Sequence, residues 1–552
     1  MKRAVALFLC LIVIMLASAA PAEEVGGMKP GWWKTLDIPQ SKTFHLDKPM
    51  TVKALGLHFN QYPKEFDGCY FFPAIEKMTG VHFDIDWRVD DDGIDEEVQE
   101  IFDNAEGDVS KLPDIVNTGM IGIAEMANKG LIIPLDDYLG LIPNIIEKVG
   151  KDRMTDLVSA DGHIYAIPKI VEVPGSLSVM VRKDWLDKLG MDIPKTWEDW
   201  KKYWYAVRDN DMNGNGDKTD EIPLVLDAGL NGDRCLQQLM NAFGIRTTYN
   251  CQFCITDDGK YTMVYEHPRF PEFLKEVRQL YKDGILDPDF AKRKQDDLFI
   301  LMDGDRCGST ATWAEHAQAS TNVLRGNGVK NALWECVPPI KGPHGDQLIP
   351  ERQEVSRNWC ITAAADKAGK TKDILRFFNW LFSREGIDLY SYGIEGQTYK
   401  TNGEKRVLNP DIVKNGFADY RSLGLQYEPF GGLWETSAFL QCMFGGEEKK
   451  DLNDAQLSFY RGVDSEGVNK GFYYSQPLTL ETEAYVRHRP KLILGPKGVC
   501  HYRNQCIKGK IGIEDFYRKY RSLKDKGLND VISQGSEAYG KMMRLANEKM
   551  PV

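Results

Sequence analysis

The stretch Thr51-Val-Lys-Ala-Leu-Gly-Leu-His-Phe59 alternates apolar and other residues, which is the spacing of a β-strand with a buried face. We expect Tyr70–Thr79 to form a helix that ends at Gly80, and Val81–Trp87 to form a second strand. A strand, a helix and a strand in this order predict parallel pairing through a crossover helix. The chain is therefore expected to be an α/β protein.

The same alternation continues along the chain. Asp114–Val116 is predicted to be a short buried strand, followed by a helix at Ile121–Lys129 and a strand at Leu131–Ile133. Ser178–Arg182 is another strand and leads into a helix at Lys183–Leu189. A chain of 552 residues is too long for one hydrophobic core, so two or more lobes are expected.

A loop rich in Asp, Asn and Gly lies between two further predicted elements. Thr196 is placed to cap a helix at Trp197–Arg208, and Ile222–Leu226 is expected to be a strand. Between them runs Asp209-Asn-Asp-Met-Asn-Gly-Asn-Gly-Asp-Lys-Thr-Asp-Glu221, with oxygen-bearing side chains at alternate positions. Such a loop is typical of Ca²⁺ sites, which use about six to eight oxygen ligands.

Two registers of this loop are compatible with a calcium site. The first begins at Asp209 and places Gly214 sixth. The second begins at Asp211, places Gly216 sixth and can close with Glu221, so we favour it. The alternative is a Gly/Asn-rich turn that binds no metal. Because no second loop follows, we expect a structural clip rather than a calcium sensor.

The amino-terminal residues 1–22 have the pattern of a secretory signal peptide. Lys2 and Arg3 precede an apolar run from Ala4 to Leu16, and small residues follow. The run is shorter than the roughly 20 residues that a membrane-spanning helix needs. The protein is therefore expected outside the cytoplasm, in the periplasm, secreted or at the cell surface.

The cysteines suggest two local pairs in such an exported chain. Cys251 and Cys254 form a CxxC motif, but it lies in an expected hairpin of Asn250–Ile255 and Tyr261–Tyr265, which argues against redox chemistry. Cys500 and Cys506 are the better candidates for a local disulfide.

Composition excludes several classes of function. The net charge of −12 argues against nucleic-acid binding and against an anionic membrane surface. The sequence has no Gly-x-Ser-x-Gly elbow, no His-Glu-x-x-His motif, no Walker loop and no dinucleotide fingerprint. Its 81 acidic residues still leave the carboxylate pair of a glycosidase open.

Aromatic residues beside turns and strand ends favour a carbohydrate ligand. A sugar ring has an apolar C–H face that a flat aromatic side chain covers, while polar side chains satisfy its hydroxyl groups. The alternative is that these side chains pack in the core or on the surface. The candidates are Trp313, Trp359, Tyr390, Tyr392, Tyr399, Tyr427 and Trp434.

Five segments of the chain form a combination that is specific when they occur in one order. They are Lys129-Gly-Leu-Ile-Ile-Pro-Leu-Asp-Asp-Tyr138, Asp161-Gly-His-Ile-Tyr-Ala-Ile-Pro168, Val181-Arg-Lys-Asp-Trp-Leu-Asp-Lys-Leu-Gly190, Pro194-Lys-Thr-Trp-Glu-Asp199 and Gly393-Ile-Glu-Gly-Gln-Thr-Tyr399, with helices expected in Gly509–Tyr539. Together they resemble the family 1 extracellular solute-binding proteins of ABC importers, and within that family the subgroup of alginate-oligosaccharide-binding proteins and related lipoproteins. Many members of this subgroup carry a lipid-attachment cysteine, which this sequence lacks.

The resemblance implies two α/β lobes joined by hinge strands, with a ligand cleft between them. The first lobe is expected from residues 48–170 and about 300–355, and the second from about 171–299 and 356–552. A membrane permease is implied as the partner of a monomeric, non-enzymatic binding protein.

The resemblance also implies two sets of site residues. The structural calcium ligands would be Asp211, Asn213, Asn215, the Asp217 carbonyl, Asp220 and Glu221. The sequence has one more residue between Gly216 and Glu221 than the commonest form of the family, so the last ligands stay open. The sugar-binding residues would be Asn60, Asn117, Thr118, Trp313, Trp359, Glu395, Gln397 and Tyr399.

Two other functions remain open. One is a secreted carbohydrate-active enzyme, and the other is a binding protein for a peptide or another solute that is not a sugar. The sequence does not identify the solute.

Overall fold

A computed structural model describes sixteen stretches of the chain. They are residues 38–57, 70–88, 100–101, 103–104, 108–117, 120–150, 157–159, 161–171, 177–226, 233–247, 252–348, 354–413, 420, 423–425, 430–443 and 482–548. The expected signal peptide and Cys251 lie outside these residues. No helix within the described stretches is long and apolar enough to cross a membrane.

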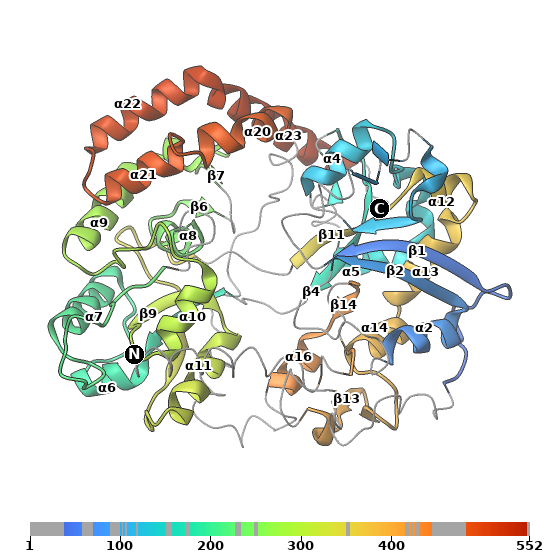
Figure 1. Cartoon of the computed structure of the whole chain (residues 1–552), viewed down its shortest axis with the longest axis horizontal. Helices are drawn as coiled ribbons and strands as arrows, with labels where there is room; N and C mark the ends of the chain where they lie inside the picture. Colours follow the sequence, from blue (N-terminus) through green and yellow to red (C-terminus); the bar gives the residue numbers. More distant parts are fainter. Residues whose placement is uncertain are drawn as a thin grey trace, which may run out of the picture.

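The first lobe is built on a six-stranded sheet, which confirms the expected α/β fold (Figure 1). Its strand order is β14-β4-β11-β3-β1-β2, and only β11 is antiparallel to its neighbours. The strands are β1 (Met50–Leu57), β2 (Val81–Arg88), β3 (Ile115–Asn117), β4 (Ala166–Val171), β11 (Glu354–Ile361) and β14 (Leu433–Trp434).

The strand–helix–strand unit predicted at the start of the chain is present. β1 pairs in parallel with β2 over eight residues, from Met50 opposite Val81 to Leu57 opposite Arg88. The intervening helix α2 (Phe71–Thr79) ends at Gly80, whose φ of 75° is left-handed and whose amide donates to the Glu76 carbonyl. A glycine adopts this conformation without the steric cost of a Cβ.

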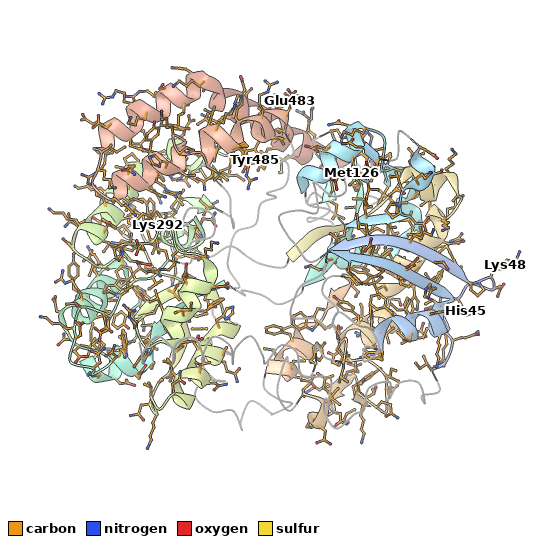
Figure 2. The ribbon with its side chains drawn as sticks, in the orientation of Figure 1. His45, Lys48, Met126, Lys292, Glu483 and Tyr485 are labelled. Carbon is orange, nitrogen blue, oxygen red and sulfur yellow. The ribbon has the colours of Figure 1, made fainter. Side chains whose placement is uncertain are left out.

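Helices cover both faces of the large sheet. Val52 and Ala54 of β1 pack with α2, α13 (Thr371–Leu381) and α14 (Arg384–Ser391) in one core cluster. Leu55 points to the other face and packs in a cluster with α4 (Met120–Asn128) and α12 (Ala363–Lys367). Figure 1 shows α4 and α12 above the sheet and α2 and α14 below it, and Figure 2 labels Met126 of α4 on the upper side.

The second lobe contains a three-stranded antiparallel sheet in the order β10-β5-β9. One side packs against α6, α7 and α8, and further buried side chains come from α10 and α11. The elements are β5 (Leu177–Arg182), α6 (Lys183–Leu189), α7 (Trp197–Asp209), α8 (Asp233–Ala242), α10 (Gln295–Asp303), β9 (Ser309–Trp313), α11 (Glu315–Gly326) and β10 (Trp334–Val337).

Carboxyl-terminal helices complete the second lobe. They share its core with α9 (Phe270–Lys282) and with the hairpin of β7 (Phe253–Ile255) and β8 (Tyr261–Met263), which was predicted from the turn at residues 257–259. In Figure 1 they arch over the top of the left half, and Figure 2 labels Tyr485 there. They are α20 (Glu483–His488), α21 (Val499–Ile507), α22 (Ile513–Leu523) and α23 (Asn529–Glu548).

The expected lobe boundaries need two corrections. Residues 300–355 were assigned to the first lobe, but β9 and β10 pair with β5 in the small sheet. Residues from 356 were assigned to the second lobe, but β11 pairs with β3 and β4 in the large sheet. The chain thus returns to the large sheet between Val337 and Glu354, and its helices from residue 483 pack in the second lobe.

Several local predictions can also be compared with the structure. Thr196 caps α7 through a capping box with Asp199, as expected. Ile222–Leu226 is not a strand, because only Ile222 and Leu224 form isolated bridges, to Cys307 and Leu286. Leu131–Ile133 likewise contains a single bridge, from Ile132 to Thr362.

The predicted local disulfide between Cys500 and Cys506 is wrong. Both residues lie on α21, both are buried, and neither forms a disulfide. Five other described cysteines are also buried and form no disulfide, namely Cys254, Cys307, Cys336, Cys360 and Cys442.

An amino-terminal arm is fastened to the first lobe by one carboxylate. Glu385 Oε2 accepts hydrogen bonds from the hydroxyl groups of Ser41 and Thr43, both at 2.6 Å, and Glu385 Oε1 accepts from the Lys42 amide at 3.1 Å. Burial alone would raise the pKa of the Glu385 carboxyl, but these hydrogen bonds and one from Trp380 lower that pKa to about 2.

Glu385→Gln is expected to destabilise the protein most at neutral pH. A lowered pKa in the folded state means that the carboxylate stabilises the fold above the ordinary value of 4.5, and that this contribution is lost as the pH falls toward 2. The difference in Tm between wild type and variant, measured from pH 7 to pH 3, should therefore shrink below pH 4.5. Exposed Glu404 supplies the control, Glu404→Gln. A difference that stays constant over this range would contradict the role of Glu385.

Candidate functional site

One edge of the large sheet is oriented toward the second lobe. β1, β3 and β4 run in the same direction, so their carboxyl ends meet at this edge. β4 ends there at Val171, and the chain next enters the small sheet at Leu177. It returns to the same edge at Glu354, where β11 begins. We call this the carboxyl edge, and ligands of open α/β sheets commonly bind at such an edge.

Polar and aromatic side chains meet at the carboxyl edge. Asn117, the last residue of β3, lies opposite Trp359 of β11 in the strand register. Asn117 Nδ2 donates to Asn358 Oδ1 at 2.9 Å. Asn117 is partly exposed, whereas Asn358 is 7% exposed. The pair therefore presents one amide group at the surface and holds it with a second amide beneath.

A backbone carbonyl fixes this arrangement from below. The Phe430 carbonyl accepts from Asn358 Nδ2 at 2.8 Å and from Trp359 Nε1 at 2.6 Å. Gly431 follows with a φ of 85°, and a Cβ there would lie 2.4 Å from Asn358 Nδ2. Only glycine therefore allows the backbone to approach the amide so closely.

Two tryptophans pack over a glycine at the same edge. The Trp87 ring, at the end of β2, is half-buried and lies 6.5 Å from the Trp359 ring between centroids. A Cβ on Gly56 would lie 2.6 Å from Trp87 and 2.9 Å from Trp359. The indole of Trp87 is thus supported from beneath and still reaches the surface.

The structure brings together only some of the residues expected to bind a sugar. Asn117 and Trp359 lie on neighbouring strands, but the Trp359 side chain is fully buried, which is a packing position. Trp313 ends β9 opposite Leu177, where the chain enters the small sheet. Asn60 and Thr118 lie outside the described residues.

The remaining three expected residues lie together in a different segment. Glu395 and Gln397 are exposed on the turn before β12 (Tyr399–Asn402), and Glu395 bridges to Tyr399. Tyr399 is 6% exposed, and burial together with Asp388 and Glu395 raises its pKa to about 12. In the described part of the chain, β12 pairs with β13 (Lys405–Leu408) in a separate two-stranded sheet, whereas Asn117 and Trp359 belong to the large sheet.

Three contributors to the carboxyl edge were not predicted as site residues. Trp87 ends a strand that was predicted, so its position was a usable signal. Asn358 and Phe430 gave no such signal, because their roles depend on contacts across 241 and 72 residues of chain.

The 211–221 loop is ordered by its own side chains. The Asp211 carboxylate accepts from the amides of Gly214 at 2.6 Å and Gly216 at 2.8 Å, and both glycines have positive φ. These two amides, the Gly216 amide first, lower the pKa of the Asp211 carboxyl. Asp209 instead pairs with Arg208 at 2.7 Å and belongs to α7.

Glu221 closes the loop from beneath. Its Oε1 accepts from the amides of Met212 at 2.6 Å and Asn213 at 2.9 Å, while Oε2 is buried without a hydrogen-bond partner. The residue is 6% exposed, and burial raises the pKa of its carboxyl against the effect of those two amides. A buried oxygen without a partner is costly, which makes this atom suited to a cation.

The remaining oxygens of the loop come from both amides and acids. Asp220 Oδ2 accepts from Asn215 Nδ2 at 2.9 Å, and Asp217 Oδ1 accepts from the Thr219 amide at 2.9 Å. Among the described residues no three His, Cys, Asp or Glu side chains converge as a metal site. The donors that fit a hard cation here are therefore a mixed set of carboxylate, amide and carbonyl oxygens.

Comparison with known proteins agrees with this fold. Residues 72–224 match the family model described as bacterial extracellular solute-binding protein. The fructooligosaccharide ABC transporter substrate-binding protein FusA of Streptococcus pneumoniae is 30% identical over 323 residues. That alignment covers 56% of this chain and 56% of the relative, little more than half the length of either protein.

Two solved structures are similar over most of the chain. An alginate-binding protein solved without calcium ion has a TM-score of 0.65 at 20% identity, covering 91% of this chain and 100% of that one. An EF-hand mutant of Streptococcus pneumoniae FusA in complex with fructo-nystose also has a TM-score of 0.65 at 20% identity, covering 90% and 100%. Both similarities show that the chain has the two-lobed α/β fold of these binding proteins.

Gly56→Ala is expected to destabilise the protein by about 1–3 kcal/mol, because the added methyl group overpacks the contact with Trp87 and Trp359. Urea unfolding followed by circular dichroism would measure this change. Gly140→Ala is the matched control, since a Cβ at Gly140 meets nothing within 4 Å. Equal stability of the Gly56 and Gly140 variants would contradict the packing described at the carboxyl edge.

Proposed function

We propose that this protein is the solute-binding component of an ABC importer, located outside the cytoplasm, and that it binds an oligosaccharide between its two lobes. A membrane permease would receive the ligand. The observation that carries the proposal is the carboxyl edge, where the half-buried Trp87 ring packs against Trp359 and Asn117 presents an amide held by Asn358. The 30% identical relative is named for fructooligosaccharides, which supports a carbohydrate as the ligand class.

The chemistry of this edge suits a sugar ring. The half-buried indole of Trp87 can cover the apolar C–H face, and an amide such as that of Asn117 can both donate and accept hydrogen bonds. Asn117 is already held by Asn358, so little side-chain entropy is lost when a ligand binds. Trp313, at the corresponding end of the small sheet, is proposed as a contact from the second lobe.

We also propose that the 211–221 loop holds a structural Ca²⁺ in the register that begins at Asp211. The buried, unpartnered Glu221 Oε2 supports this proposal, and so do the two left-handed glycines. Asp211, Asn213, Asn215, Asp217, Asp220 and Glu221 would hold the ion. When bound, the cation supplies positive charge that balances the carboxylates of the loop.

A panel of oligosaccharides should contain at least one ligand that raises the Tm. A ligand that binds only the folded state stabilises it by about 2.7 kcal/mol at one hundred times Kd. Trp87→Ala should weaken binding of that ligand about tenfold or more, equivalent to ~1.4 kcal/mol. Tyr502→Ala, which removes a half-buried aromatic from α21, should bind it as the wild type does.

The same panel separates the alternatives. Reducing ends released from any of these glycans would favour a carbohydrate-active enzyme. Stabilisation by peptides, without any response to sugars, would favour a binding protein for another solute.

Chelation of calcium is expected to lower the Tm of the wild type, because a structural ion binds the folded state only. Glu221→Gln should remove most of this response, as measured by thermal scans with CaCl₂ and with EDTA. Asp209→Asn is the matched control, because Asp209 pairs with Arg208 outside the loop. Loss of the response in Asp209→Asn would instead support the register that begins at Asp209. An unchanged wild-type curve would exclude a tight structural ion.

A further inference from the structure

A fully buried guanidinium lies at the end of β5. Arg182 is 0% exposed, and Asp184 binds it with two hydrogen bonds of 2.8 Å and 2.6 Å. Asp305 accepts a third hydrogen bond at 2.5 Å. The guanidinium also lies 4.6 Å from the ring centroid of Trp185 and 5.8 Å from that of Trp334. A buried charge of this kind depends strongly on each of its partners.

Asp305 has an unusual backbone conformation. Its φ is 59°, and among the described residues it is the one residue other than glycine with positive φ. Asp and Asn accept this conformation more readily than most residues. While the Asp305 carboxylate binds Arg182, the Asp305 carbonyl accepts from Asn213 Nδ2 at 3.3 Å. One residue therefore contacts both the buried charge and the 211–221 loop.

Neighbouring contacts bind the same turn to the loop. Arg306 Nε donates to the Asp220 carbonyl at 3.1 Å, and the Ile222 amide donates to the Arg306 carbonyl at 2.8 Å. On the other side, Lys188 of α6 donates to the Asp211 carbonyl at 2.8 Å. Since α6 follows Arg182 directly, the loop, the turn, Arg182 and α6 are joined in a closed series of contacts.

We propose that Asp305 is a positioning residue that couples cation binding in the 211–221 loop to the buried Arg182 at the end of β5. The proposal rests on the calcium site proposed above. Cation binding would order Asn213 and Asp220, and their contacts would hold the turn so that the Asp305 carboxylate stays on Arg182. β5 begins at Leu177, beside the expected ligand contact Trp313, so the coupling reaches the strand through which the chain enters the second lobe.

Coupling of this kind is reciprocal, so its effect can be measured as a change in the affinity for the cation. If cation binding stabilises the Asp305–Arg182 pair, then weakening that pair must weaken cation binding by the same factor. Asp305→Asn is the suitable variant, because asparagine accepts positive φ and is close in shape, but it lacks the negative charge. Titration calorimetry with CaCl₂ should give a Kd that is raised about 5-fold or more in Asp305→Asn.

The matched control is Asp346→Asn, which breaks another ion pair of the second lobe. Asp346 pairs with Arg269 at 2.6 Å and makes no recorded contact with the loop. This variant should keep the wild-type Kd for Ca²⁺. An equal loss of affinity in both variants would overturn the proposal, because general loosening of the lobe would then explain it. Wild-type affinity in Asp305→Asn would overturn it as well.

Hydrogen exchange gives a second measurement that needs no variant. In the wild type, CaCl₂ should slow amide exchange in α6, Lys183–Leu189, compared with EDTA, and leave α13 unchanged. Unchanged exchange in α6 with a measurable calcium Kd would overturn the coupling but keep the calcium site. If the wild type binds no Ca²⁺ in calorimetry, both proposals fail.

Discussion

The path of the chain between two sheets is the constraint on which the structure depends. The chain leaves the large sheet where β4 ends at Val171 and returns to it where β11 begins at Glu354. Both connections lie at the edge where β1 and β3 also end. Because β11 returns from that edge, it must run antiparallel to its neighbours, and it carries Trp359 to the end of β3, opposite Asn117.

Local sequence patterns predicted much of this fold. The strands and helix from residue 50 to 88, the Thr196 cap and the hairpin at residue 253 each depend on residues close together in the chain. The lobe boundaries were assigned wrongly because they depend on strand pairing across long separations. Nothing near residues 309 or 334 in the sequence reveals that β9 and β10 flank β5.

The candidate site was predicted less completely for a similar reason. Trp359 was expected to face a ligand, yet it is buried beneath Trp87 because Gly56 lets the two rings pack against its Cα. Residue type and position in the sequence did not reveal that Trp359 is buried and Trp87 is partly exposed. In contrast, the 211–221 loop was recognisable because the Asp211 and Glu221 carboxylates accept from backbone amides that lie within ten residues.

The absence of disulfides among the described cysteines has a consequence for how such a chain reaches its native state. Seven described cysteines are buried, so oxidants have little access to them once the chain is folded. Before folding they are exposed, and outside the cytoplasm, where the protein is proposed to act, the surroundings favour disulfides. Folding must therefore be faster than wrong pairing of thiols. After heating without a reductant, wrongly paired chains would accumulate and the loss of structure would become irreversible.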